Sequence, residues 1–296
     1  MVRLFEQVLA VILLVCGVYI GWRRWIGPLR AQLDSQATGM LVLAILAVIG
    51  GAVGGPFWWR NDPNSFSWML PPLAARLLGS AGAAFALTGC YALEHRSERL
   101  IRTYTALLAV YLAPLVVAIV LFHLDRFNWR APITYAFFAV SGGMALAATW
   151  HLVRRTALGA SFADAKEPAA PALVQCWFWA VAIGAGLWGL SMFVDPTFPW
   201  PLIFIWPQDQ LTSRLIAAML LTLSTAALFG LQSMKQARLS LWMFIIYGTG
   251  ATAACLWNAV AGASVPVSYA GAFCGLALGS ILCCSSLRRR SILVGQ

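Results

Sequence analysis

Nine apolar runs, each about 20 residues long, constrain this chain more than any other feature of its sequence. They lie near 4–22, 38–56, 72–93, 101–123, 131–153, 173–194, 211–231, 239–261 and 267–286. A helix needs a run of this length to cross the hydrocarbon core of a bilayer. The pattern therefore predicts an all-α polytopic transmembrane bundle of about nine spans, without β-strands.

Composition supports a lipid environment. The chain of 296 residues is 61% hydrophobic and only 10% charged, and its mean hydropathy is +0.79. A water-soluble domain of this size cannot bury so much apolar side chain in one core. We therefore expect membrane lipids to surround most of the chain.

The basic residues predict an orientation. If the N-terminus lies outside, 14 of the 20 Lys and Arg residues fall in the inner segments 23–37, 94–102, 151–172, 232–240 and 287–296. Only Arg3, Arg60, Arg126 and Arg130 fall in the outer ones. Positive charge concentrates on the cytoplasmic side of membrane proteins. This bias predicts an inner (plasma) membrane protein with its N-terminus outside and its C-terminus inside.

The net charge of +10 has the same explanation. Basic residues in short loops set the topology and attract anionic headgroups. They form no separate basic domain of the kind that binds nucleic acid. We expect no nucleic-acid partner.

One sequence element occurs twice at an offset of 138 residues. Its matching positions are Phe66, Trp68, Leu73, Arg76 and Leu77, and then Phe204, Trp206, Leu211, Arg214 and Leu215. In each copy a segment rich in Trp and Pro leads into an apolar helix. The repetition predicts a 1+4+4 plan with a parallel internal repeat, whose two copies share one orientation because four spans is an even number.

This plan divides the chain into four parts. Residues 1–37 form an N-terminal anchor helix and inner loop, and 38–155 form the first four-helix repeat. Residues 156–172, rich in Ala and Pro, form a flexible cytoplasmic linker. Residues 173–296 form the second four-helix repeat and a basic tail.

Glycines predict where helices approach closely. The run at 38–56 carries Gly50, Gly51, Gly54 and Gly55, and the last run carries Gly271, Gly275 and Gly279. Small residues four positions apart let helix backbones come together in lipid. We expect both stripes to lie at helix contacts.

The repeated arginines are the candidate site. Arg76 and Arg214 should lie about 6 Å inside the outer ends of their helices. Such a charge either extends to the headgroups, pairs with an acid, or binds an anion. The acids on the same side are Asp62, Asp125, Asp195 and Asp209. With Trp68 and Trp206, the two arginines are the candidate ligand-binding residues.

The outer segments 57–71 and 195–210 are too rich in proline to span the membrane. Their indole rings suit the membrane interface, which predicts an aromatic belt. The alternative is a lid over a cavity.

Residues for catalysis or metal binding are sparse. The three histidines, His95, His123 and His151, lie at helix ends, and the seven cysteines include no C-x-x-C pair. Carboxylates are missing from the middle of every apolar run. We therefore expect no cofactor, no metal, no catalytic residue and no enzymatic activity.

The element W-x₂-P-P-L-x₂-R-x₂-G, formed by Trp68, Pro71, Pro72, Leu73, Arg76 and Gly79, resembles a pattern of uncharacterised bacterial multi-pass membrane proteins. The resemblance implies a bacterial origin and a role for the Trp/Arg element. It implies no particular activity.

Two hypotheses about function follow. The first is a non-catalytic subunit or scaffold of a larger membrane complex, with other membrane protein subunits as partners. The alternative is a transporter or binder of an anionic lipid or small anion that uses Arg76 and Arg214. The first predicts stoichiometric partners, and the second predicts a cavity between the repeats that opens to the outer face.

Overall fold

The computed structural model describes residues 2–66, 68–164, 167–195, 203, 206 and 209–294, with the side chains of 2–7, 64 and 288–294 outside the description. Its long helices are α1 (Val2–Gly21), α2 (Ser35–Trp59), α3 (Pro72–Glu94), α4 (Glu98–Phe122), α5 (Pro132–Val153), α6 (Ala172–Val194), α7 (Gln210–Gly230), α8 (Met234–Val260) and α9 (Val267–Val294). A π-helical turn, Trp22–Ile26, and a short 3₁₀ turn, Gly27–Leu29, follow α1.

Within these residues, nine helices are long and apolar enough to cross a membrane. Each coincides with one of the predicted runs, and the described chain contains no strand. The prediction of an all-α multi-pass membrane protein is therefore confirmed for this part of the chain. The largest differences are at α8, which begins at Met234 rather than at 239, and at α9, which continues past 286. Phe204 of the repeated element lies outside the described residues.

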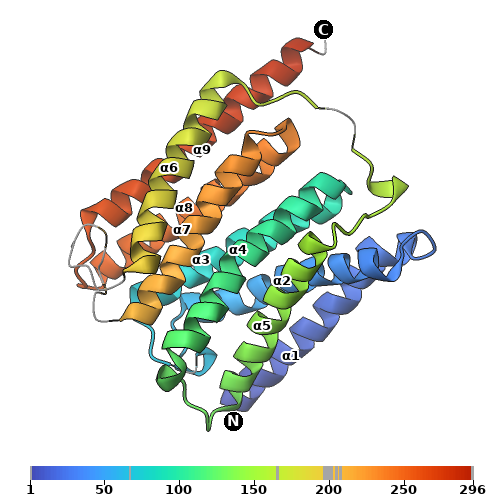
Figure 1. The fold of residues 1–296 in the computed structure, drawn as a ribbon. Coiled ribbons are helices and arrows are strands. Elements are labelled where there is room, and N and C mark those ends of the chain that lie inside the picture. The colour runs from blue at the N-terminus through green and yellow to red at the C-terminus, as the bar shows by residue number, and fades with distance from the viewer. Residues whose placement is uncertain are drawn as a thin grey trace.

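The centre of the bundle consists of α3, α4, α7 and α8. α3 packs against α2 and α8, and α7 packs against α6 and α4. The spans of α3 and α7 are 72% and 78% buried, whereas that of α1, which packs mainly on α2, is only 11% buried. The helices run side by side, and the two termini lie at opposite ends of the bundle (Figure 1). The outer helices α1, α5, α6 and α9 thus present most of their surface to the surrounding solvent, which for this composition is lipid.

Small residues bring α2 and α3 together. A Cβ added at Gly51 would lie 2.3 Å from the carbonyl oxygen of Gly82, and one at Gly79 would lie 2.9 Å from that of Gly55. Backbones this close leave no room for a larger side chain. In contrast, most of the glycine stripe predicted in the last helix does not lie at a helix contact. A Cβ at Gly271 or Gly275 would meet nothing within 4 Å. Only Gly279 of that stripe lies at a contact, against the Trp177 ring.

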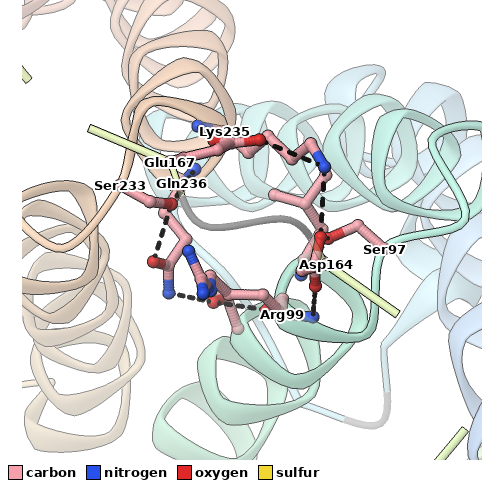
Figure 2. A network of polar contacts seen from close by, with 9 residues as sticks. Ser97, Arg99, Asp164, Glu167, Ser233, Lys235 and Gln236 are labelled. Carbon is pink, nitrogen blue, oxygen red and sulfur yellow. Dashed lines mark hydrogen bonds and ion pairs between the residues drawn. The ribbon is translucent and has the colours of Figure 1, made fainter. Parts of the chain in front are cut away.

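Two described residues of the connection between α5 and α6, Asp164 and Glu167, bind α4 and α8, whereas the sequence predicted a flexible linker here. The connection crosses the end of the bundle at which the C-terminus lies (Figure 1). Asp164 accepts hydrogen bonds from the Ser97 hydroxyl (2.6 Å), the backbone N–H of Arg99 (2.9 Å) and the Lys235 ammonium (3.1 Å). Figure 2 shows these side chains converging between the first turns of α4 and α8. Lys166 lies outside the described residues.

A second carboxylate holds α8 in the same way. Glu167 accepts a hydrogen bond from the backbone N–H of Lys235 (3.0 Å) and forms an ion pair with the Lys235 ammonium (3.1 Å) (Figure 2). Ser97 and Ser233 cap α4 and α8, so each carboxylate meets the N–H two residues after a serine cap. Anions are stabilised at helix N-termini. We call Ser97, Asp164, Glu167 and Lys235 the linker clamp.

Candidate functional site

The two repeated arginines lie at the end of the bundle opposite the linker clamp. At this end α3 and α7 begin and α4 and α8 finish. We call it the arginine end. Proline at the first position starts α3, and the Asp209 side chain, which accepts from the backbone N–H of Thr212, caps α7. These caps place Arg76 and Arg214 about one turn inside their helices.

Arg214 is nearly enclosed, with 9% of its surface exposed. Its Nε donates to the carbonyl oxygen of Phe193 (3.1 Å), and its Nη1 lies 2.6 Å from Nε2 of His123. Its guanidinium carbon is 4.9 Å from the centre of the Phe122 ring. An arginine only donates, so His123 must accept at Nε2 and carry its proton at Nδ1. His123 is therefore a neutral partner of the guanidinium.

The surroundings keep His123 neutral. Burial lowers the pKa of this imidazole below its usual value, and the positive charges of Arg214 and Arg126 lower it further. Asp125 and Asp209 oppose the shift without reversing it. At neutral pH the guanidinium of Arg214 is thus the only positive charge of this pair.

This shift predicts a pH dependence of stability. The unfolded chain protonates His123 near its ordinary pKa of about 6.5, while the folded chain does so only at lower pH. Because the unfolded state then binds more protons, stability falls as pH drops through 6.5 and below. Thermal unfolding at pH 7.5 and 5.5 should show a smaller loss in His123→Asn than in the wild type. His95→Asn, which changes an exposed imidazole at the other end of the bundle, should keep the wild-type loss; equal losses in all three proteins would contradict this assignment.

Arg76 is held in a similar way at the end of α8. Its Nη1 donates to Oδ1 of Asn258 (3.0 Å) and to the carbonyl oxygen of Pro72 (3.3 Å), one turn back toward the start of α3. The guanidinium carbon lies 5.9 Å from the centre of the Trp257 ring. Nε of Arg76 is buried and has no hydrogen-bond partner. This guanidinium therefore has an unused donor in addition to its charge.

The two sites share one arrangement. Each arginine contacts an aromatic residue and the polar residue after it, at the end of a helix from the opposite half of the chain. These pairs are Phe122–His123 for Arg214 and Trp257–Asn258 for Arg76. The contacts join α3 to α8 and α7 to α4, the same helices that pack together in the centre. The arginines and their partners thus fasten the two halves together at this end.

Neither guanidinium is paired with a carboxylate within the described chain. The ion pairs found there are Arg24–Glu94, Arg102–Glu98, Lys235–Asp164 and Lys235–Glu167. Asp209, one of the acids expected to pair with an arginine, instead accepts from Thr212. Neutral acceptors orient both arginines, and their positive charge stays uncompensated by these contacts.

The two tryptophans of the repeated element lie at this end but belong to aromatic clusters. The Trp68 ring packs against Phe66, Phe127 and Phe137, at centroid distances of 5.7, 5.0 and 5.3 Å. The Trp206 ring contacts Tyr269 at 6.4 Å. Within the described residues, their ring contacts and hydrogen bonds do not include the arginines. The expected four-residue site is thus two arginine sites, each beside an aromatic cluster.

Two cavities of the described chain lie near the first copy of the repeated element. One, of about 320 Å³, lies beside Trp68 in the segment between α2 and α3. Nε1 of Trp68 is buried and lacks a hydrogen-bond partner. The other, of about 370 Å³, lies at the junction of α2, α3 and α8. Neither is lined by an arginine, and the second lies where α2 and α3 of the first half meet α8 of the second half.

The described histidines, cysteines and carboxylates include no group that could hold a metal ion. Comparison with sequence profiles of protein families, with curated proteins and with solved structures finds no match for this chain. The geometry of the arginine end is therefore the basis for a functional proposal.

Sequence reasoning found the arginines and missed their partners. His123 is 91 residues from Arg214, and Asn258 is 182 residues from Arg76. A usable signal existed in the two aromatic–polar pairs, Phe122–His123 and Trp257–Asn258, at the ends of corresponding helices. Each pair becomes meaningful only when α4 is placed beside α7 and α8 beside α3.

Proposed function

We propose that this chain is a bacterial inner-membrane protein that binds an anionic ligand at Arg76 and Arg214. The observation that carries the proposal is that both guanidiniums are oriented by neutral acceptors and none of their described contacts is a carboxylate. A cation at a membrane protein's helix end, without a counter-charge, attracts an anion strongly because the surroundings screen it poorly.

The chemistry of arginine favours a phosphate or carboxylate ligand. The planar guanidinium donates two parallel hydrogen bonds to such groups. In both sites one Nη and the aromatic ring fix the plane of the guanidinium in advance, which reduces the entropy lost on binding. The unpartnered Nε of Arg76 adds a donor that a ligand oxygen can satisfy.

We further propose that the two halves are copies related by an axis along the membrane normal, with the arginine end outside. The reciprocal contacts of α3 with α8 and of α7 with α4, and the paired arginine sites, support a repeat of 38–155 and 173–296. The distribution of Lys and Arg supports the orientation. The ligand would then come from the outer leaflet of the inner membrane or from the space outside it.

A second proposal is that the chain acts as a non-catalytic subunit or scaffold that holds other membrane subunits. The close packing of α3, α4, α7 and α8 favours a static binding role over transport. Stable co-purification of other subunits at fixed stoichiometry would support it, and isolation as a lone, stable monomer would count against it.

Thermal stabilisation by inorganic phosphate tests the anion site. In a neutral detergent at constant ionic strength, the full chain should gain stability as phosphate replaces chloride. A ligand at a hundredfold excess over its Kd stabilises by about 2.7 kcal/mol. Arg76→Gln and Arg214→Gln should each weaken this response, and the double variant should abolish it.

The matched control is Arg130→Gln, because Arg130 is an exposed arginine at the same end. This variant should respond to phosphate like the wild type. An undiminished phosphate response in the folded double variant would refute the proposal.

A further inference from the structure

We propose that the Arg76 site binds a phospholipid with a net negative headgroup, whose acyl chain occupies the cavity between α2, α3 and α8. This inference rests on the proposed anion site and names the class of its ligand. It follows from the position of the cavity relative to Arg76, from the nature of its lining, and from the uncompensated guanidinium above it.

The cavity continues the face of α3 on which Arg76 lies. Its lining on α3 includes Ser80, Ala83 and Leu87, which are 4, 7 and 11 residues after Arg76. At 3.6 residues per turn these positions form one stripe below the arginine. On α8, Gly250 lies eight residues before Asn258 and therefore on the stripe below the partner of Arg76. The polar site and the apolar cavity thus lie one above the other on the same two helices.

The depth of the cavity matches one lipid leaflet. From Gly79 to Leu87 the lining extends along α3 for about 12 Å, compared with about 15 Å for half of the hydrocarbon core. The Arg76 side chain turns back toward Pro72 and the start of the helix, which places its charge at the level of the headgroups. Ala52, Pro56 and Leu87 are exposed, so the cavity is open toward the surrounding lipid.

The lining explains why an acyl chain fits. It consists almost entirely of Gly, Ala and larger apolar residues, with Ser80 as the one hydroxyl, whose Oγ donates to the carbonyl oxygen of Arg76. A mostly apolar lining whose one hydroxyl is already hydrogen-bonded offers contact area to a hydrocarbon chain without breaking that bond. The guanidinium supplies the complementary charge for a phosphate. A free anion would use only the upper part of this site.

The Arg214 site differs from the Arg76 site at the positions that line this cavity. Ala83 of α3 corresponds to Leu221 at the 138-residue offset of the repeated element, and Gly250 of α8 corresponds to Leu115 at the 135-residue offset that relates Asn258 to His123. Larger side chains therefore stand at the positions that line the cavity of the first site. The two sites share the anion chemistry, and only the Arg76 site is built for a lipid chain.

Native mass spectrometry of the purified full chain separates the headgroup from the chain. The probes are phosphatidylglycerol and glycerol phosphate, which share the phosphate and differ in their acyl chains. The wild type should retain phosphatidylglycerol at concentrations at which glycerol phosphate dissociates. Arg76→Gln should weaken lipid binding by about tenfold because it removes the charged donor.

Filling the cavity tests the acyl-chain part alone. Ala83→Phe and Ala52→Phe each place a ring in the cavity and should weaken phosphatidylglycerol binding by about tenfold, while leaving the thermal response to inorganic phosphate unchanged. Ala139→Phe, on the exposed face of α5, and Arg130→Gln should bind the lipid like the wild type.

The outcomes distinguish this inference from the anion site. If the folded cavity variants retain wild-type lipid binding, the acyl-chain assignment is wrong, whatever the arginine variants do. If the response to inorganic phosphate persists in the double arginine variant, the anion site itself is wrong. Equal affinity for phosphatidylglycerol and glycerol phosphate would also overturn the lipid assignment.

Discussion

Asp164→Ala should lower the free energy of unfolding by about 3 kcal/mol, the low end of the range for breaking a buried ion pair. The Asp164 carboxylate is only 10% exposed, whereas Lys235 is 31% exposed and can be partly rehydrated. The substitution also leaves the Ser97 hydroxyl and the Arg99 N–H without their acceptor. Because these groups start α4 and α8 from opposite halves of the chain, the loss should appear as cooperative unfolding at lower temperature.

An exposed carboxylate is the control for this substitution, and the pH dependence of stability is a second check. Asp125→Ala removes an exposed carboxylate and should change stability by at most about 0.5 kcal/mol. Partial burial opposes ionisation of Asp164, but hydrogen bonds from Ser97, Arg99 and Lys235 outweigh it and lower the pKa of the carboxyl. Its stabilising effect is therefore complete above the unfolded value of about 3.9 and is lost as pH falls through the lower folded value. An Asp164→Ala protein as stable as the wild type at pH 7 would show that the clamp contributes nothing.

Gly51→Ala should destabilise the bundle by about 1–3 kcal/mol, the range for overpacking a close contact. The added Cβ would lie 2.3 Å from the carbonyl oxygen of Gly82, so α2 and α3 would have to separate. Backbone atoms cannot rotate away as a flexible side chain can. Unfolding of the full chain in detergent, by heat or by sodium dodecyl sulfate, measures the effect.

Gly50→Ala is the matched control, because it makes the same change one position away. A Cβ at Gly50 would meet nothing within 4 Å. Alanine is favoured over glycine in a helix by about 1 kcal/mol, so this variant should be as stable as the wild type or slightly more stable. If the two variants behave alike, the close approach of α2 and α3 does not limit stability.

The glycines illustrate what the sequence could predict. The positions of the membrane-spanning helices could be predicted from the length and apolarity of the sequence runs, because a bilayer requires both of every helix that crosses it. The contact faces did not follow, because glycine spacing is the same whether a stripe faces a helix or lipid. Gly51 meets α3, while Gly271 and Gly275, in the more regular stripe, meet nothing. Only the positions of the neighbouring helices distinguish these cases.

The candidate site shows the same limit. Repetition identified Arg76 and Arg214, and depth along the helix placed them correctly near its start. Their partners could not be predicted, because they come from the opposite half of the chain. The contacts of the linker could not be predicted for a related reason. Its Ala and Pro content indicated flexibility, whereas its carboxylates Asp164 and Glu167 bind helix N-termini that the sequence does not place beside it.

The most direct test of the arginine end is mass spectrometry of small molecules and lipids that remain bound after gentle detergent extraction. The wild type and the double variant Arg76→Gln/Arg214→Gln are compared, with Arg130→Gln as the control. We expect a phosphate-bearing lipid at a fixed ratio to the wild-type and control proteins and its loss from the double variant. The same bound lipid in all three proteins, or none in any of them, would contradict an anion site at Arg76 and Arg214.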